Sequence, residues 1–308
     1  MTTQFKLAAA LILSGLIVAG CQKPAEKAEG PAAPAVQPTA STDVYPFTIG
    51  ELQAVALKDG DLALDNVTGQ SPWADNAGVA EALRPTGDAK IHLSIQPLLI
   101  RGDDKVVLID TGAGGQMGTA NRLPTSLAAA GVQPGQITDI LISHGHGDHV
   151  GGLVSNGALT YPNATIRMSA AEWTALQADA ELTALIPVIT PKVETFEPGA
   201  ELTPSITAVS LQGHTPGHTG YEIVSGQDRL LYLGDALHSS VISVERPEYV
   251  NQWDFDSDAA IATRLAILGR GATQSLRTYG VHFPFPGLGT FRRQEDGFVW
   301  VQETPAQP

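Results

Sequence analysis

The chain has 308 residues, with 18 Lys and Arg against 32 Asp and Glu, and a formal net charge of −14 at pH 7. Outside Arg292-Arg293 it has no cluster of basic residues, which excludes the basic face that a nucleic-acid partner needs. Its single cysteine excludes an internal disulfide, so the folded part must be stable through its apolar core.

The N-terminal residues are typical of an export signal, because an apolar segment follows Lys6 and is short for a membrane span. This segment ends at Val18-Ala19-Gly20-Cys21, which resembles a bacterial lipobox, a motif whose cysteine is lipidated. We therefore expect a signal peptide over residues 1–21 and a disordered Ala- and Pro-rich tether over 22–42. The expected location is the periplasm, with the lipid on Cys21 anchored in the outer membrane. A plain cleaved signal is the alternative.

Residues 43–308 have a globular composition that suits one large domain or two tightly joined halves. Short apolar runs bounded by turn residues outnumber helical patterns, which predicts sheets covered by helices and not a purely parallel array. Strands are predicted over 52–57, 91–101, 105–110, 137–142, 165–168, 206–211, 220–224, 229–233, 279–283 and 297–301. Helices are predicted over 122–130, 170–178 and 257–268. The glycine-rich turn at 112–118 does not end in Gly-Lys-Ser/Thr, so it does not predict a phosphate-binding loop.

The run Ser143-His144-Gly145-His146-Gly147-Asp148-His149 directly follows the predicted strand 137–142. Imidazole and carboxylate groups at this density indicate a site for a divalent metal. We expect the two glycines to let the backbone bend tightly enough to direct all four side chains to one place.

Three further candidate ligands also stand at the ends of apolar strands. His214 follows strand 206–211, Asp235 follows strand 229–233, and His282 lies in the late strand 279–283. Because loops after such strands gather at one rim of a sheet, these side chains are expected to meet the histidine run there.

In this order and spacing the ligands resemble those of the metallo-β-lactamase superfamily. The resemblance covers about residues 46–302 and implies a four-layer αββα sandwich of α/β (α+β) class, with a two-metal site along one edge. The stretches at 233–238, 252–258 and 282–287 are similar to the methyl parathion hydrolase branch. That branch includes exported organophosphate-cleaving enzymes and relatives that act on esters or lactones.

The resemblance also implies a role for each donor. His144, His146 and His214 would hold the first metal, Asp148, His149 and His282 the second, and Asp235 would bridge the two. Zinc is expected, and the second position, with two imidazoles and two carboxylates, would also accept Mn, Fe or Co.

Two residues are expected to support the ligands from behind. Asp110 would orient a ligand imidazole, although a carboxylate that caps its turn is an equal alternative. His218 would be a supporting or structural neighbour of His214. His92 and His238 match no ligand position.

Two divalent ions lower the pKa of a bound water, so the resemblance implies metal-assisted hydrolysis without a protein nucleophile. No Gly-x-Ser-x-Gly motif is present. Asp148 or Asp235 would pass a proton to the leaving group. The expected substrate is a small neutral ester, first of all an organophosphate triester such as methyl parathion. The alternatives are a lactonase or arylesterase with incidental phosphotriesterase activity and, less favoured, a metal-binding lipoprotein without catalysis.

Four aromatic residues are candidates for an apolar wall around the substrate: Trp73, Trp173, Phe283 and Phe285. Ordinary core packing is the alternative for each of them and is favoured for Trp73 and Trp173. The last two follow His282 closely in the sequence. β-Lactam hydrolysis is less favoured, because no cysteine is free to serve at the second metal. Relatives are often dimers, so the resemblance also implies a homodimer.

Overall fold

The structure is a computed structural model and describes residues 42–119, 121–295 and 297–303. The predicted signal peptide, its lipobox cysteine and nearly all of the predicted tether lie outside these residues and stay predictions. Within the described ranges, no helix combines the length and apolarity needed to cross a membrane.

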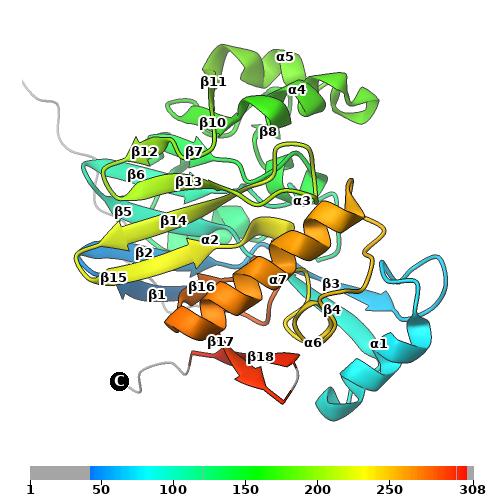
Figure 1. Ribbon diagram of the computed structural model, residues 1–308. Helices are drawn as coiled ribbons and strands as arrows, with labels where there is room; N and C mark the ends of the chain where they lie inside the picture. Colours follow the sequence, from blue (N-terminus) through cyan, green and yellow to red (C-terminus); the bar gives the residue numbers. More distant parts are fainter. Residues whose placement is uncertain (1–41, 120, 296, 304–308) are drawn as a thin grey trace, which may run out of the picture. The chain divides into compact units, whose positions relative to one another are not determined.

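Two seven-stranded sheets form the centre of the fold (Figure 1). The first sheet has the order β1-β2-β5-β6-β7-β10-β11, and its last four strands run parallel. Its strands are β1 (Val44–Ile49), β2 (Leu52–Leu57), β5 (Leu98–Gly102), β6 (Lys105–Ile109), β7 (Asp139–Leu141), β10 (Thr165–Ser169) and β11 (Val193–Phe196).

The second sheet has the order β12-β13-β14-β15-β16-β17-β18 and is antiparallel except for the pair β15–β16. Its strands are β12 (Glu201–Thr203), β13 (Ile206–Ser210), β14 (Thr219–Ser225), β15 (Asp228–Tyr232), β16 (Arg277–Tyr279), β17 (Leu288–Gln294) and β18 (Gly297–Gln302). Because β13, β15 and β16 point the same way, the loops after them leave from one edge of this sheet.

The two sheets bury apolar side chains on both of their faces. Ala54 and Ala56 of β2 face the core between the sheets, while Val55 and Leu57 face outward. Two-sided burial is the reason that β2 is apolar at every position from Ala54 to Leu57 and does not alternate there.

Helices cover both outer faces and complete the predicted αββα arrangement. The first sheet is covered by α2 (Leu123–Ala129), α4 (Ala170–Ala178) and α5 (Ile186–Ile189). The second is covered by α6 (Ile242–Glu245) and by α7 (Ser257–Gln274), which crosses it in Figure 1. The fold expected from the sequence is confirmed.

Smaller elements stand at the edge where the site lies. The ribbon of β3 (Gly60–Asp65) and β4 (Lys90–Ile95) packs with α1 (Asn76–Leu83). The short helix α3 (Gly147–Val150) precedes a small hairpin of β8 (Val154–Ser155) and β9 (Ala158–Leu159).

Several predicted boundaries are wrong for identifiable reasons. The run 91–101 breaks before Leu98 into β4 and β5, because Pro97 ends one strand and the two halves join different sheets. The late strand ends at Tyr279, so His282 lies in the turn that follows it. Helix α7 continues past Leu268 through its glycines. Strand β1 was not predicted because it contains Pro46, which the sheet tolerates at its edge.

Candidate metal centre

Four loops bring the seven predicted ligands to one edge of the sandwich, each loop leaving the C-terminal end of a strand. The loop after β7 carries His144 and His146 and leads into α3 with Asp148 and His149. The other three loops follow β13, β15 and β16 in the second sheet and carry His214, Asp235 and His282, respectively.

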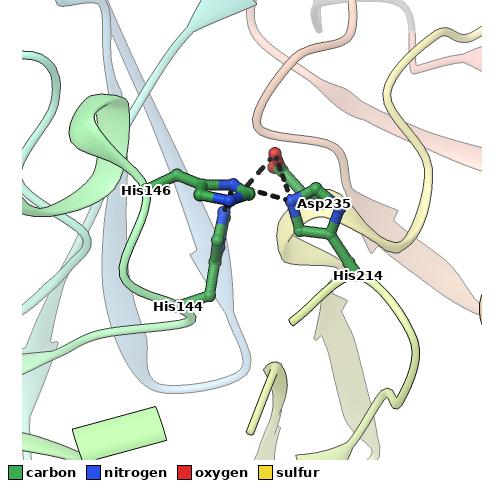
Figure 2. A group of neighbouring side chains, drawn as sticks. All are labelled: His144, His146, His214 and Asp235. Atoms are coloured by element: carbon green, nitrogen blue, oxygen red, sulfur yellow. Dashed lines mark hydrogen bonds and ion pairs between the residues drawn. The ribbon is translucent and has the colours of Figure 1, made fainter. Parts of the chain in front are cut away.

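The donor atoms form two groups, and within each group they lie within 4.8 Å of one another. In the first group, His146 Nδ1 is 3.0 Å from both His144 Nε2 and His214 Nε2. Asp235 Oδ2 lies 3.6 Å from His144 Nε2 and 3.5 Å from His214 Nε2. Figure 2 shows these four side chains pointing toward one another.

The second group consists of Asp148, His149 and His282. Asp148 Oδ2 is 3.4 Å from His282 Nε2 and 3.7 Å from His149 Nε2. Asp235 reaches this group with its other oxygen, because Oδ1 lies 3.0 Å from His282 Nε2 and 3.3 Å from His149 Nε2. One carboxylate therefore stands between both groups.

Hydrogen bonds on the far side of three rings determine which nitrogen faces the centre. The Nδ1 atoms of His149, His214 and His282 donate to Asp110 Oδ2 (2.7 Å), Asp254 Oδ1 (3.1 Å) and Ser94 O (2.7 Å). Since these oxygens only accept, each neutral ring presents the lone pair of Nε2 to the centre, as a metal ligand requires.

The electrostatics of the centre fit two divalent cations. Burial lowers the pKa of His144 and His146 and lowers that of His214 to about 3, so these imidazoles are neutral at pH 7. Burial also opposes protonation of His149 and His282, but the Asp235 carboxylate raises the pKa of both. Within the described residues, His149 Nε2 and Asp235 Oδ1 are buried without a hydrogen-bond partner. Lone pairs that converge in this way call for positive charge between them.

Asp110 lies behind His149 and receives several hydrogen bonds. Its carboxylate accepts from Ser143 N (2.8 Å), Ser143 Oγ (2.7 Å) and Tyr232 OH (2.7 Å), besides the imidazole. Its φ of +60° is in the left-handed region, which Asp tolerates better than most residues. The backbone thus accepts some strain where it directs this carboxylate at a candidate ligand.

The His218 ring holds the main chain at Asp235 in place. Its Nδ1 donates to Leu211 O at 2.8 Å, so Nε2 accepts from the backbone N–H of Asp235 at 2.9 Å. Gly234 has φ +50°, and a Cβ atom there would stand 2.5 Å from His218 Nε2. The Leu-Gly-Asp sequence therefore requires glycine before the bridging aspartate.

The two glycines of the histidine run act differently from what we expected. Neither Gly145 nor Gly147 has a positive φ, so the bend does not depend on left-handed backbone. A Cβ atom on Gly145 would lie 2.3 Å from Leu176 Cδ1, so the Leu176 side chain would have to shift to admit one. A Cβ atom on Gly147 would meet open space.

Glu172 of α4 is a supporting residue that the sequence did not reveal. It is buried and accepts from Gly145 N (2.7 Å), Gly217 N (3.0 Å) and Thr215 Oγ1 (2.6 Å). Burial raises its pKa, although these hydrogen bonds favour the ionised form. The carboxylate joins the loop of His144 and His146 to the loop of His214.

We expect Glu172→Leu to lower the free energy of unfolding by about 3 kcal/mol, because three buried donors lose a charged acceptor. Zinc affinity should fall as well, since both loops are released. Urea unfolding and zinc competition measure the two effects. Glu194→Leu, on the exposed side of β11, is the matched control. A stability equal to that of the unmodified chain would contradict this role.

An apolar cavity of about 250 Å³ opens onto the centre. Its polar lining comes from the centre itself, namely His146, Asp148, Asp235 and His282, and its apolar lining comes from the β3–β4 ribbon and the loops of Met117 and Trp253. The apolar wall residues are Leu62, Leu93, Ile95, Met117 and Trp253. Such a lining suits an uncharged or weakly polar ligand.

The four aromatic residues predicted for this wall lie elsewhere, so that prediction is wrong. Phe283 packs against Phe291 and Trp300 on the outer face of the second sheet, and Phe285 packs on the core between the sheets. Trp73 is buried in the cluster of the β3–β4 ribbon and α1, and Trp173, on α4, packs against the outer face of the first sheet. Nearness in sequence to His282 did not place Phe283 near the cavity, because the chain turns there.

Comparisons with known proteins agree with this geometry. A model of the Metallo-beta-lactamase superfamily matches residues 94–272. An N-acyl homoserine lactonase of Bacillus cereus is 26% identical over 211 residues, which cover 61% of this chain and 80% of the lactonase.

Two solved structures are similar over most of their length. AidC, a dizinc quorum-quenching lactonase in complex with its product, is 30% identical, with a TM-score of 0.78 over 86% of this chain and 98% of AidC. The hydrolase AbOPH, described as a member of the beta lactamase superfamily, is 26% identical, with a TM-score of 0.78 over 87% of this chain and 100% of AbOPH.

Proposed function

The chain belongs to the metallo-beta-lactamase superfamily and is a metal-dependent hydrolase, and we propose that its substrates are lactones with an apolar acyl chain, of the N-acyl homoserine lactone type. The observation that carries the proposal is the apolar cavity over the metal centre, taken with the lactonase activity named for two relatives. An organophosphate triester, the first expectation from the sequence, has no comparable support and stays a prediction.

The seven candidate ligands would hold two divalent ions, and we propose zinc at both positions because AidC is a dizinc enzyme. When bound, such ions act as Lewis acids and lower the pKa of water toward neutrality. His144, His146 and His214 would bind the first ion, Asp148, His149 and His282 the second, and Asp235 both.

The residues around the substrate have distinct tasks in this proposal. Leu93, Ile95 and Met117 receive the acyl chain and keep water from it. Hydrolysis adds water to the lactone carbonyl, breaks the ring C–O bond and leaves a proton for the released alkoxide. Asp148, whose side chain is 13% exposed and lines the cavity, is the carboxylate placed to pass that proton; Asp235 is the alternative.

A substrate panel tests the proposal. We expect the purified zinc-loaded chain to hydrolyse N-hexanoyl homoserine lactone at least about tenfold faster, by kcat/KM, than an aryl ester or a methyl phosphotriester. A chelator should abolish the reaction, and added zinc should restore it. Turnover of phosphotriesters alone would refute the lactonase proposal, and no turnover at full metal content would favour a non-catalytic metal-binding protein.

A further inference from the structure

An eighth candidate donor, His238, lies inside the centre but outside both ligand groups. It is 1% exposed, and its Nε2 is 3.2 Å from Asp235 Oδ2. Its ring stacks on that of His282, with centroids 5.9 Å apart and planes 7° from parallel, and lies 4.8 Å from the ring of His214. Its closeness to Asp235, His214 and His282 makes it necessary to ask what it does there.

Neighbouring hydrogen bonds determine where the proton of the His238 ring lies. The backbone N–H of Trp253 donates to Asn251 Oδ1 at 2.9 Å, so the amide group of Asn251 turns its Nδ2 toward His238. That Nδ2 is 3.1 Å from His238 Nδ1. Since an amide nitrogen only donates, Nδ1 accepts and the ring proton is on Nε2.

This tautomer decides what His238 can do. A protonated Nε2 has no lone pair to offer, so His238 cannot bind a metal through the atom that faces the centre. Nε2 is buried, and no described residue accepts a well-aligned hydrogen bond from it. The N–H group is instead held beside Asp235 Oδ2, where the negative charge of the carboxylate attracts it.

We propose that His238 is a positioning residue that holds the Asp235 carboxylate between the two metal positions without being a ligand, and that Asn251 fixes its tautomer. The proposal rests on the proposed function in one respect, since it takes Asp235 to bind both metals. Asn251 is buried and forms a β-bridge with Trp73, so the amide is itself held in place. The segment that carries Asn251 also carries Trp253 of the cavity wall and Asp254 behind His214.

Paired substitutions at His238 separate positioning from packing. His238→Gln keeps an N–H donor at a similar distance from the backbone, whereas His238→Leu removes it. We expect His238→Leu to lower zinc affinity about ten- to a hundredfold, as loss of a group behind a ligand does, and His238→Gln to stay within about threefold of the unmodified chain. Competition with a chelating dye measures affinity for zinc alone, and His92→Leu, at an exposed histidine, is the matched control.

The tautomer is measured directly, without activity. In the zinc-loaded chain labelled with ¹⁵N-histidine, two-bond ¹H–¹⁵N spectra should show His238 protonated at Nε2, and the signal should disappear in His238→Gln. A proton on Nδ1, or zinc affinity unchanged in His238→Leu, would overturn the proposal. Should His238→Leu fail to fold, the spectrum of the unmodified chain still decides. If the chain binds two zinc ions but hydrolyses no lactone, the substrate proposal fails. Zinc affinity and the histidine spectrum still decide whether His238 positions Asp235.

Discussion

Asp235→Ala is expected to lower kcat/KM for lactone hydrolysis at least about a thousandfold, because this one carboxylate lies beside histidines of both ligand groups. Its Oδ1 lies 3.0 Å from His282 Nε2, and its Oδ2 lies 3.5 Å from His214 Nε2. Removing this carboxylate would take one ligand from each metal, and no side chain would then fix the distance between the two metals. A thousandfold fall in kcat/KM corresponds to the loss of several kcal/mol by which the metals stabilise the transition state.

Metal content distinguishes a bridging role from a purely local one. Bound zinc, measured by elemental analysis after gel filtration, should fall from two ions per chain to one or fewer in Asp235→Ala. Asp65→Ala is the matched control, since Asp65 is exposed and its ion pair with Lys90 lies at the surface. Two tightly bound ions in Asp235→Ala would contradict the assignment of Asp235 as the bridge.

The candidate ligands could be predicted because their chemistry is visible in short, spaced motifs. His144 to His149 form a dense run, and His214, Asp235 and His282 each follow a recognisable apolar strand or lie near its end. The strands that precede these loops, β7 in the first sheet and β13, β15 and β16 in the second, bring the loops to one edge of the fold. The order of the strands along the chain does not by itself show that the loops meet there.

Of the residues that support the ligands, Asp110 and His218 stand beside the motifs and could be proposed from the sequence, whereas others could not. Glu172 is an ordinary helical glutamate by sequence, and Asn251 stands in a loop without a motif. Asp254 lies in the stretch 252–258, but the family resemblance of that stretch does not indicate what the side chain contacts. Their roles arise only when helix α4 and the loop before α7 pack beside the centre. The cavity wall shows the same limit, since Leu93 and Met117 are far apart in sequence and look like common core residues.

Edge and connecting elements were the least predictable part of the fold. Strand β11 at the end of the first sheet is only half apolar, and β17 carries Arg292 and Arg293 on an outer part of the second sheet. Local sequence favours such strands weakly, and pairing with a buried neighbour decides their conformation.

Arg264→Met is expected to lower the free energy of unfolding by about 3–5 kcal/mol, since it leaves the buried carboxylate of Asp254 without its charged partner. Arg264 is 2% exposed, and its Nη1 is 2.9 Å from Asp254 Oδ2. Its other nitrogens donate to the carbonyl groups of Pro247 (3.0 Å) and Tyr249 (3.1 Å). Urea unfolding of the metal-free chain measures the loss, and Arg292→Met, at an exposed arginine of β17, is the control.

The double variant Asp254→Leu with Arg264→Met separates stability from metal binding. Replacing both charges by apolar side chains should recover part of the lost stability, because no buried charge remains unpaired, while the carbonyl groups of Pro247 and Tyr249 still lack their donor. Zinc affinity should nevertheless stay about ten- to a hundredfold low, since His214 Nδ1 has lost the acceptor that orients its ring. Zinc affinity equal to that of the unmodified chain would show that Asp254 does not orient His214.

The same pair predicts a pH effect in the metal-free chain. Burial would raise the pKa of Asp254, but the hydrogen bond from His214 and the charge of Arg264 hold it below its ordinary value of 3.8. A carboxylate with a lowered folded pKa contributes stability that is complete above 3.8 and is lost as the pH falls through the folded value. The double variant should therefore lose less stability than the unmodified chain as the pH falls below 3.8, and identical acid-unfolding profiles would contradict the assigned charge pair.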